Sequence, residues 1–95
     1  MKYLVYIISN KKQGVLYIGK TKRLKKRIYQ HKTKAHPNTF SARYNLDKLV
    51  YFEAFETEDE ANLREKRMKK WYRAWKIELI EKSNPEWKDL YEVLK

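Results

Sequence analysis

One stretch, residues 17–31, constrains the fold most, because its pattern changes from strand-like to helical across a single glycine. Residues 15–18 are apolar and include β-branched and aromatic side chains, which predicts a strand that Gly19 ends. From residue 22 the pattern is helical, since Leu24 and Ile28 lie four apart, and Thr21 is a suitable N-cap. A strand that turns into a helix N-terminus is a favourable place for an anion.

The same predicted helix carries a column of basic groups. Arg23, Arg27 and His31 follow one another at intervals of four residues, so they lie along one helical face. For each residue alone, a solvated basic face is the preferred explanation. Taken with the glycine turn and Tyr17, the column favours a phosphate-binding site.

Length and composition limit the class of protein. The 95 residues make one small domain, 1–95, with one modest core. The chain has no cysteine, which excludes disulfides and thiolate metal sites and fits a reducing cytoplasm. No apolar run approaches the roughly twenty residues of a membrane span, and the N-terminus does not resemble a signal peptide. We therefore expect a cytoplasmic monomer without membrane attachment.

The charge of the chain is its strongest global signal. Lys and Arg number 23 against 12 Asp and Glu, a net charge of +11. Such an excess indicates a polyanionic partner, most often nucleic acid. Anionic lipid ranks lower, because the basic residues are spread along the chain and do not flank a hydrophobic anchor. A basic protein whose charge serves only solubility is the remaining alternative.

The periodicities predict an α+β fold, with a three-stranded antiparallel sheet flanked by helices in the order β-β-α-β-α-α. Strands are expected at 2–8, 15–18 and 49–55, the first central because both of its faces are apolar. Helices are expected at 22–33 and from 58 to about 72, the second opened by a capping box, and helix continues over 75–81 after a bend near 73–74. A loop or short irregular helix covers 36–45. Asn84 and Pro85 would start a closing helix with the stripe Trp87, Leu90, Tyr91 and Leu94.

The second long helix contains one anomaly. Glu65 falls on the face that also carries Ala61, Met68, Tyr72 and Trp75. A carboxylate on an apolar face is costly unless it has a partner. That partner could be a basic side chain such as Arg64 or Lys69. The functional alternative is a carboxylate at the edge of a cleft that binds a divalent cation.

The ordered set of these residues resembles the GIY-YIG endonuclease superfamily, most closely its small single-domain bacterial members of unassigned role. Residues 4–6, Leu-Val-Tyr, match the first half-motif and residues 17–19, Tyr-Ile-Gly, match the second. The first half-motif departs from the family at Leu4, which stands where the family has glycine, but Tyr6 is retained. The remaining matches to the family site are Arg27, His31, Glu65 and Asn84.

The resemblance implies phosphodiester hydrolysis with one divalent metal, Mg²⁺ or Mn²⁺. Tyr6 is the expected general base, with Tyr17 as the alternative, and the base role needs a lowered pKa or a proton passed to a neighbour. Arg27 would clamp the scissile phosphate, His31 would bind phosphate or relay a proton, and Glu65 would bind the metal. The expected nucleic-acid-binding residues are Lys20, Arg23, Lys26 and Asn84, although Asn84 serves equally well as a plain helix cap.

The leading functional hypothesis is therefore a metal-dependent DNA endonuclease with low intrinsic sequence selectivity, since the chain shows no appended recognition domain. Its partner would be DNA, including branched or damaged DNA, with RNA less favoured. The alternative is a non-catalytic nucleic-acid-binding module on the same fold. A protein-interaction domain is the third hypothesis.

Overall fold

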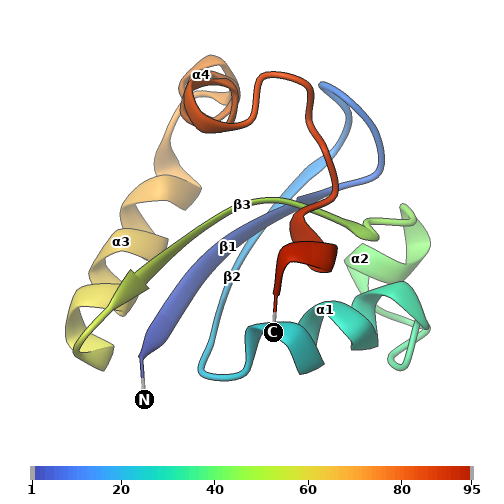
Figure 1. Cartoon of the computed structure of the whole chain (residues 1–95), viewed down its shortest axis with the longest axis horizontal. Helices are drawn as coiled ribbons and strands as arrows, with labels where there is room; N and C mark the ends of the chain where they lie inside the picture. The colour runs from blue at the N-terminus through green and yellow to red at the C-terminus, as the bar shows by residue number, and fades with distance from the viewer. Residues whose placement is uncertain (1, 95) are drawn as a thin grey trace.

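A computed structural model describes residues 2–94 and confirms the α+β class. Its sheet has three antiparallel strands in the order β2-β1-β3, with β1 in the predicted central position (Figure 1). The elements are β1 (Tyr3–Ser9), β2 (Leu16–Thr21), α1 (Leu24–Lys32), α2 (Phe40–Arg43), β3 (Lys48–Phe55), α3 (Glu58–Lys70), α4 (Arg73–Ser83) and the 3₁₀ helix η1 (Leu90–Val93). The order differs from the expected one by the short α2 and by η1.

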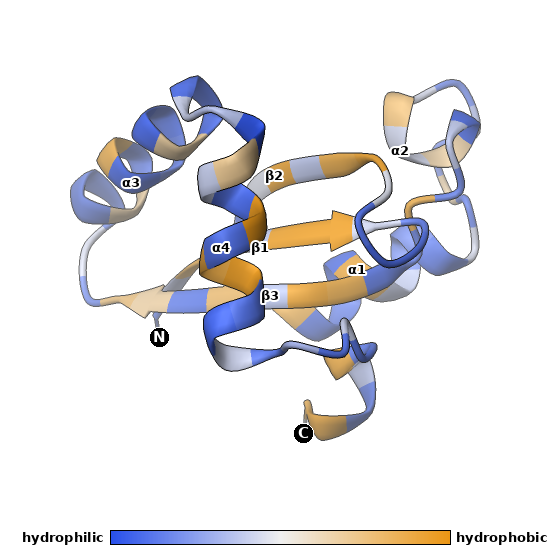
Figure 2. Ribbon diagram, turned by 90° about the horizontal axis from the view of Figure 1, so that it is seen from above, coloured by the Kyte–Doolittle hydropathy of each residue, from blue (hydrophilic) through white to orange (hydrophobic). Residues whose placement is uncertain are grey.

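Helices cover both faces of the sheet. In Figures 1 and 2, α3 and α4 lie on one face, where α4 crosses the strands, and α1 lies on the other. The central strand β1 contributes side chains to the core on both faces of the sheet, because successive side chains of a strand point to opposite faces. Val5 and Ile7 belong to the cluster that includes Met68 of α3 and Ile80 of α4. Tyr6 belongs to the second cluster, which also contains Ile8 of β1 and Leu24 and Ile28 of α1.

Strand β2 runs past Gly19, so the prediction that this glycine ends the strand is wrong. Gly19 pairs with Tyr6 across the ladder, and it does not have a positive φ. A β-carbon at this position would lie 2.5 Å from both Cζ and the hydroxyl oxygen of Tyr6. Gly19 is therefore needed for space, because the Tyr6 ring lies across it, and not for a turn.

Helix α1 begins two residues later than predicted, and Thr21 is not its N-cap. Arg23 holds the N-cap position and makes no side-chain capping hydrogen bond. The Thr21 hydroxyl instead accepts a hydrogen bond of 3.0 Å from the Arg23 backbone N–H. This local turn bends the chain from β2 into the helix.

The capping box of α3 is present as predicted. Thr57 accepts from the Glu60 backbone N–H, and the Glu60 carboxylate accepts from the Thr57 backbone N–H. The helix ends at Lys70, where Trp71 and Tyr72 adopt extended backbone conformations before α4 starts. Because of this break, Tyr72 and Trp75 are exposed, so the expectation that they continue the apolar face of Ala61 and Met68 is wrong.

The closing helix predicted from Asn84 onward does not form. Asn84 is the C-cap of α4, and its buried side-chain amide donates to the backbone oxygens of Val50 and Lys88 at 3.1 and 2.9 Å. Its oxygen accepts from the Lys88 backbone N–H at 3.0 Å. Trp87 is buried with a φ of 57°, which lies outside the range of right-handed helices. The segment is thus an irregular turn held against β3, followed by η1.

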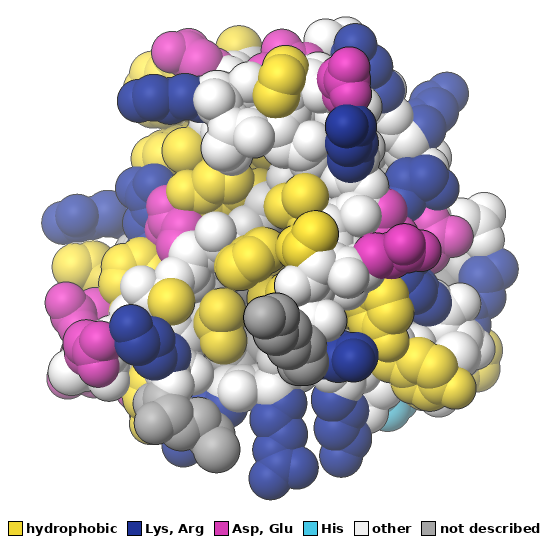
Figure 3. Space-filling view, viewed as in Figure 1, with side chains coloured by type: hydrophobic (Ala, Val, Ile, Leu, Met, Phe, Trp, Pro, Cys, Tyr) yellow, Lys and Arg dark blue, Asp and Glu magenta, His cyan; other side chains and the backbone are white. Residues whose placement is uncertain are grey.

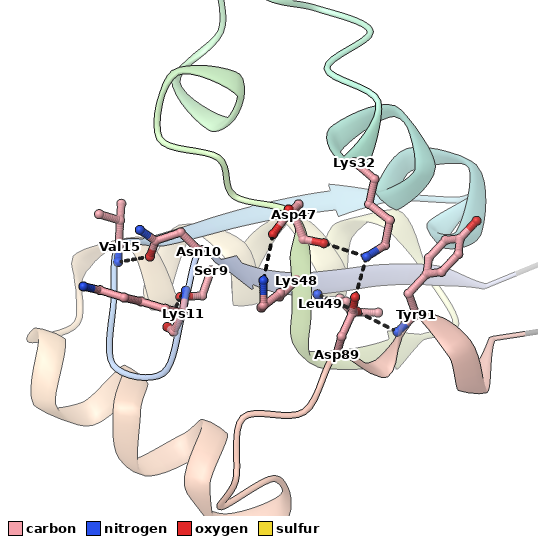
Figure 4. Close-up of polar contacts among 10 residues, drawn as sticks. All are labelled: Ser9, Asn10, Lys11, Val15, Lys32, Asp47, Lys48, Leu49, Asp89 and Tyr91. Atoms are coloured by element: carbon pink, nitrogen blue, oxygen red, sulfur yellow. Dashed lines mark hydrogen bonds and ion pairs between the residues drawn. The ribbon is translucent and has the colours of Figure 1, made fainter.

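Asp89 fixes this C-terminal segment to the rest of the fold (Figure 4). Its carboxylate accepts from the backbone N–H groups of Leu49 and Tyr91 at 3.2 and 3.0 Å. It also pairs with Lys32 at the end of α1, and the same ammonium donates to the Asp47 carbonyl at 2.8 Å. The arrangement holds α1 and β3 to the last residues that the structure describes.

Candidate active site

A buried hydrogen bond joins two of the predicted site residues. The Tyr6 hydroxyl lies 3.1 Å from Nε2 of His31, and both residues are buried. They meet because Tyr6 points from β1 toward the face that α1 covers, while His31 stands one turn after Ile28 on the buried side of α1. Residues 25 positions apart in the sequence thus form one polar unit inside an apolar cluster.

The direction of this hydrogen bond is set by a chain of hydroxyl groups behind it. The Thr39 hydroxyl donates to the His36 carbonyl at 2.8 Å, so its only proton is used. Ser41 must then donate to Thr39 at 3.3 Å and accept from Nδ1–H of His31 at 2.9 Å. Nε2 of the neutral imidazole is left as the acceptor, and Tyr6 donates its phenolic proton to it.

Burial keeps both partners in their neutral forms. Desolvation lowers the pKa of His31 to about 4, and the nearby charges of Arg27 and His36 act in the same direction. Desolvation also raises the pKa of Tyr6. The Arg27 guanidinium, within reach of the Tyr6 hydroxyl, opposes that shift in pKa, while the charges of Tyr17 and Glu65 add to it. Tyr6 therefore keeps its proton at neutral pH.

An open cavity of about 320 Å³ lies in front of this pair. Tyr17 of β2, Arg27 and His31 of α1, and Phe40 of α2 all line it. The ring of Tyr17 stands 6.1 Å from that of His31. The two candidate tyrosines thus differ in position: Tyr17 faces the cavity, whereas Tyr6 lies behind His31 and is 1% exposed.

A basic groove leads into the cavity along α1. This groove, of about 380 Å³, is lined by Thr21, Lys22, Arg23, Lys26, Arg27 and Gln30, and it shares the last two with the cavity. Arg27 also donates to the Gln30 side chain at 3.3 Å. In Figure 3, long basic side chains project from the margin of the molecule beneath α1. Arg23 and Lys26 line the same groove as Arg27, as binding of a phosphate backbone requires.

Glu65 approaches the site from α3. Its side chain is 21% exposed and lies 3.4 Å from the Lys69 ammonium, one turn later. Its charge helps to raise the pKa of Tyr6, although Glu65 belongs to the helix layer on the other face of the sheet. Within residues 2–94, no three His, Cys, Asp or Glu side chains gather where they could hold a metal ion together. A cation here would have Glu65 as its carboxylate ligand and take its other ligands from water and phosphate.

Residues 2–78 match the GIY-YIG catalytic domain. The chain belongs to the GIY-YIG nuclease family. Its relatives include a UPF0213 protein of Clostridium perfringens, 45% identical over 80 residues, which are 80% of each chain. A UPF0213 protein of Staphylococcus saprophyticus is 37% identical over 83 residues, 83% of this chain and 94% of the relative. Neither relative has a name that states an activity, and no solved structure matches the chain.

Two residues predicted for nucleic-acid binding do not line the basic groove or the cavity. Lys20 points to the face covered by α3, where it pairs with Glu58 at 3.5 Å and donates to Asn62. Asn84 is used in the turn after α4, against β3, which is the strand farthest from β2. No helix among residues 2–94 has the length and apolar character that crossing a membrane requires.

The sequence reasoning missed the hydroxyl residues behind His31. Thr39 accepts from the Ala42 backbone N–H and so caps α2, which presents Ser41 to Nδ1 of His31. The one available signal was the Thr39 cap before a short helical run. Phe40 was also missed, since nothing in its local pattern marks it as a residue of the cavity wall.

Proposed function

We propose that this GIY-YIG domain is a divalent-metal-dependent DNA endonuclease with low intrinsic sequence selectivity. One observation carries the proposal: an oriented Tyr6–His31 hydrogen bond stands behind a cavity whose wall also holds Arg27 and Tyr17. The charge of Glu65 reaches the same hydroxyl. Phosphodiester hydrolysis needs an activated water, an added positive charge and a held phosphate, and this set contains a group for each.

Water activation is assigned to Tyr6 acting through His31. Tyrosine is a good base only as the phenolate, which is scarce at neutral pH because the ordinary pKa of the phenol is near 10. It can accept a proton from water if its own proton passes to Nε2 of His31 in the same step. The water then becomes the attacking hydroxide equivalent, and the phenol is neutral again. The resulting imidazolium is disfavoured by burial. When the phosphorus–oxygen bond breaks, Nε2 of His31 therefore returns its proton to the Tyr6 oxygen, while Tyr6 releases its own proton, through water, to the leaving oxygen.

Tyr17 remains the alternative base, and a specific observation favours it. Its ring lines the cavity, whereas Tyr6 is almost wholly buried. Under this alternative, water would contact Tyr17, and His31 with Tyr6 would position the cavity wall. Tyr6→Phe and Tyr17→Phe separate the two assignments in single-turnover cleavage, because only the base variant should lose the pH-dependent part of the rate.

Arg27 is assigned to the phosphate. It lies where the basic groove meets the cavity, so its guanidinium can bind the backbone that the groove guides. A planar fork of N–H donors fits two phosphate oxygens and stabilises the charge that grows on them in the transition state. Arg23 and Lys26 extend this contact along α1 without base-specific donors, which fits low selectivity.

Glu65 is the proposed ligand of Mg²⁺ or Mn²⁺. A single half-buried carboxylate fits an ion that retains most of its waters and binds substrate phosphate, and it predicts weak binding without substrate. When bound, the metal supplies positive charge that polarises the phosphate. The Lys69 ammonium forms an ion pair with the Glu65 carboxylate, and it would have to move aside for the cation to bind.

The second candidate function is a non-catalytic nucleic-acid-binding module. The burial of Tyr6 and the pairing of Glu65 with Lys69 favour it, since both groups are already engaged. The basic groove alone would be enough for such a module.

A cleavage screen distinguishes the two. Supercoiled plasmid and single-stranded, duplex, flap and branched DNA are incubated with Mg²⁺, with Mn²⁺ or with EDTA. Metal-dependent products that the Glu65→Gln variant fails to make support the endonuclease, while the control Asp59→Asn, an exposed carboxylate change on the same helix, should cut like the parent. Binding of these DNAs without cleavage of any would establish the binding module instead.

A further inference from the structure

A short segment outside the site concentrates aromatic and basic residues. Residues 66–77 contain six cations, three large aromatic residues and no acid. The cations are Lys66, Arg67, Lys69, Lys70, Arg73 and Lys76, and the aromatics are Trp71, Tyr72 and Trp75. The segment spans the break between α3 and α4, where the backbone is extended at Trp71 and Tyr72.

This break places the aromatic rings at the surface. Tyr72 is 72% exposed and Trp75 is 51% exposed, and their rings meet edge to face with centroids 4.9 Å apart. Trp71 completes the group at 6.3 Å from Trp75, and Arg64 stacks on the Trp71 ring at 4.9 Å. We call Trp71, Tyr72 and Trp75 the aromatic platform. A groove of about 500 Å³ lined by Trp71, Trp75, Glu78, Leu79 and Lys82 lies beside it.

The exposed rings have no structural role that accounts for them. Trp71 packs against the core cluster, but Tyr72 and Trp75 are not among the side chains that do so. Exposed aromatic rings grouped together usually mark a binding surface, and the surrounding charge decides which partner fits. The six cations outnumber the flanking acids, Glu65 and Glu78, and this excess of positive charge favours a polyanion over a protein partner or a neutral ligand.

We propose that the aromatic platform binds single-stranded nucleic acid, with unpaired bases stacked on Tyr72 and Trp75 and the neighbouring lysines against the backbone. Only unpaired bases offer free faces to such rings, because the faces of paired bases are stacked inside the duplex. Arg73 holds the platform in place, since its guanidinium donates to the carbonyls of Gln13 and Gly14 at 2.6 and 2.5 Å.

The platform also lies near the cleavage site. Trp71 follows Glu65 by six residues, which is about 9 Å along a helix axis. The loop that Arg73 contacts joins β1 to β2, and Tyr17 is the second residue of β2. This part of the inference rests on the proposed function: the preferred substrate then carries a single-stranded segment beside the scissile bond, as flaps and branches do.

The test is equilibrium binding in EDTA, so its result does not depend on cleavage. A fluorescent twelve-nucleotide oligothymidylate and a twelve-base-pair duplex are titrated with the parent, Trp75→Leu and Trp75→Phe. Trp75→Leu should bind the single strand about 5- to 150-fold more weakly and the duplex within about twofold of the parent. Trp75→Phe, which keeps a ring, should recover most of the affinity.

Salt dependence identifies the kind of contact. Trp75→Leu should leave the slope of log K against log salt unchanged, whereas Lys70→Gln should reduce it by about one. Leu63→Ala, an exposed apolar change on α3 outside the platform, is the control and should bind as the parent does. Unfolding curves check that each variant is folded. Equal losses on single strand and duplex, or no loss on either, would overturn the proposal, even if the protein cuts DNA.

Discussion

A β-carbon at Gly19 would lie 2.5 Å from the hydroxyl oxygen of Tyr6. Contact this close excludes every other residue unless the Tyr6 ring moves, and the ring cannot move without leaving Nε2 of His31. The glycine of the second half-motif and the tyrosine of the first are therefore linked by space, on strands paired at these positions.

Gly19→Ala should accordingly damage the site more than the fold. Overpacking of this kind costs about 1–3 kcal/mol, and displacement of the Tyr6 hydroxyl should lower cleavage at least tenfold. Urea denaturation and single-turnover cleavage measure the two effects. In a Tyr6→Ala background the same alanine should cost much less stability, because the ring that it meets is gone. An equal cost in both backgrounds would contradict the steric explanation.

The low pKa of His31 predicts that stability depends on pH. His31 has a pKa of about 4 when folded and an ordinary value of 6.5 when unfolded, so the unfolded state binds its proton first as the pH falls. The contribution of His31 to stability is complete above pH 6.5 and is lost progressively toward pH 4. At pH 5 the free energy of unfolding should be about 2 kcal/mol lower than at pH 7.5.

Urea denaturation at the two pH values checks this effect, with His31→Gln and His36→Gln beside the parent. His31→Gln should lose most of the pH dependence, while His36→Gln, a change in an exposed loop, should retain most of it, because His36 is the smallest of the causes that lower the pKa of His31. The carboxylates of Glu53 and Asp89, whose pKa values are lowered, contribute mainly below about pH 4.5. A parent protein equally stable at both pH values would refute a buried neutral His31.

Arg27 separates catalysis from binding. Arg27→Ala should lower turnover by roughly 10²-fold or more, because its guanidinium is assigned to the charge of the transition state. Affinity should fall far less, since Lys22, Arg23 and Lys26 still line the groove. Arg27→Lys should rescue poorly, because an ammonium lacks the planar fork. Single-turnover rates and binding constants are compared with Arg23→Ala, which should mainly weaken binding.

The pairing of Glu65 with Lys69 predicts competition between the ammonium and the metal. Lys69→Met should lower the concentration of Mg²⁺ or Mn²⁺ that half-activates cleavage, because the carboxylate no longer has to leave an ion pair. Titration of metal against cleavage rate measures this, with Lys66→Met as the control on an exposed position of α3. A higher metal requirement in Lys69→Met would mean that Lys69 contacts the DNA instead.

Binding to DNA should weaken steeply with salt. The main term is release of counterions from phosphates, so contact with six phosphates reduces affinity roughly 10³-fold between about 50 and 200 mM salt. The net charge of +11 and the basic groove along α1 motivate this expectation. Fluorescence anisotropy over a salt series measures it, and a flat series would leave the charge as an aid to solubility only.

Local pattern was enough for the sheet and for the column on α1. The alternation of apolar residues placed Tyr3–Ser9 at the centre, and the spacing of Arg27 and His31 placed them on one side of a helix. These features depend on neighbours in the sequence, so a single sequence carries them. The apolar spacing that should have continued past Trp87 failed, because Asn84 binds the backbone of Lys88 and replaces the first helical turn.

Tertiary contacts explain what could not be predicted. The need for Gly19 comes from a ring on the neighbouring strand, and the orientation of His31 comes from Ser41, ten residues later on another helix. Neither cause lies within the local window that periodicity examines. The placement of Lys20 against Glu58 has the same origin, since strand alternation sends it to the α3 face.

The ion pair between Lys32 and Asp89 lets the C-terminal segment help to position α1, the helix that carries site residues. The helix that carries Arg27 and His31 is secured at its end by a carboxylate eleven positions beyond residue 78, where the family match stops. Leu90, Tyr91 and Leu94 also pack on the cluster that contains Leu24 and Ile28. The segment that matches the family model is therefore shorter than the structural unit, and a fusion protein that uses this domain has to include residues 79–94 as well.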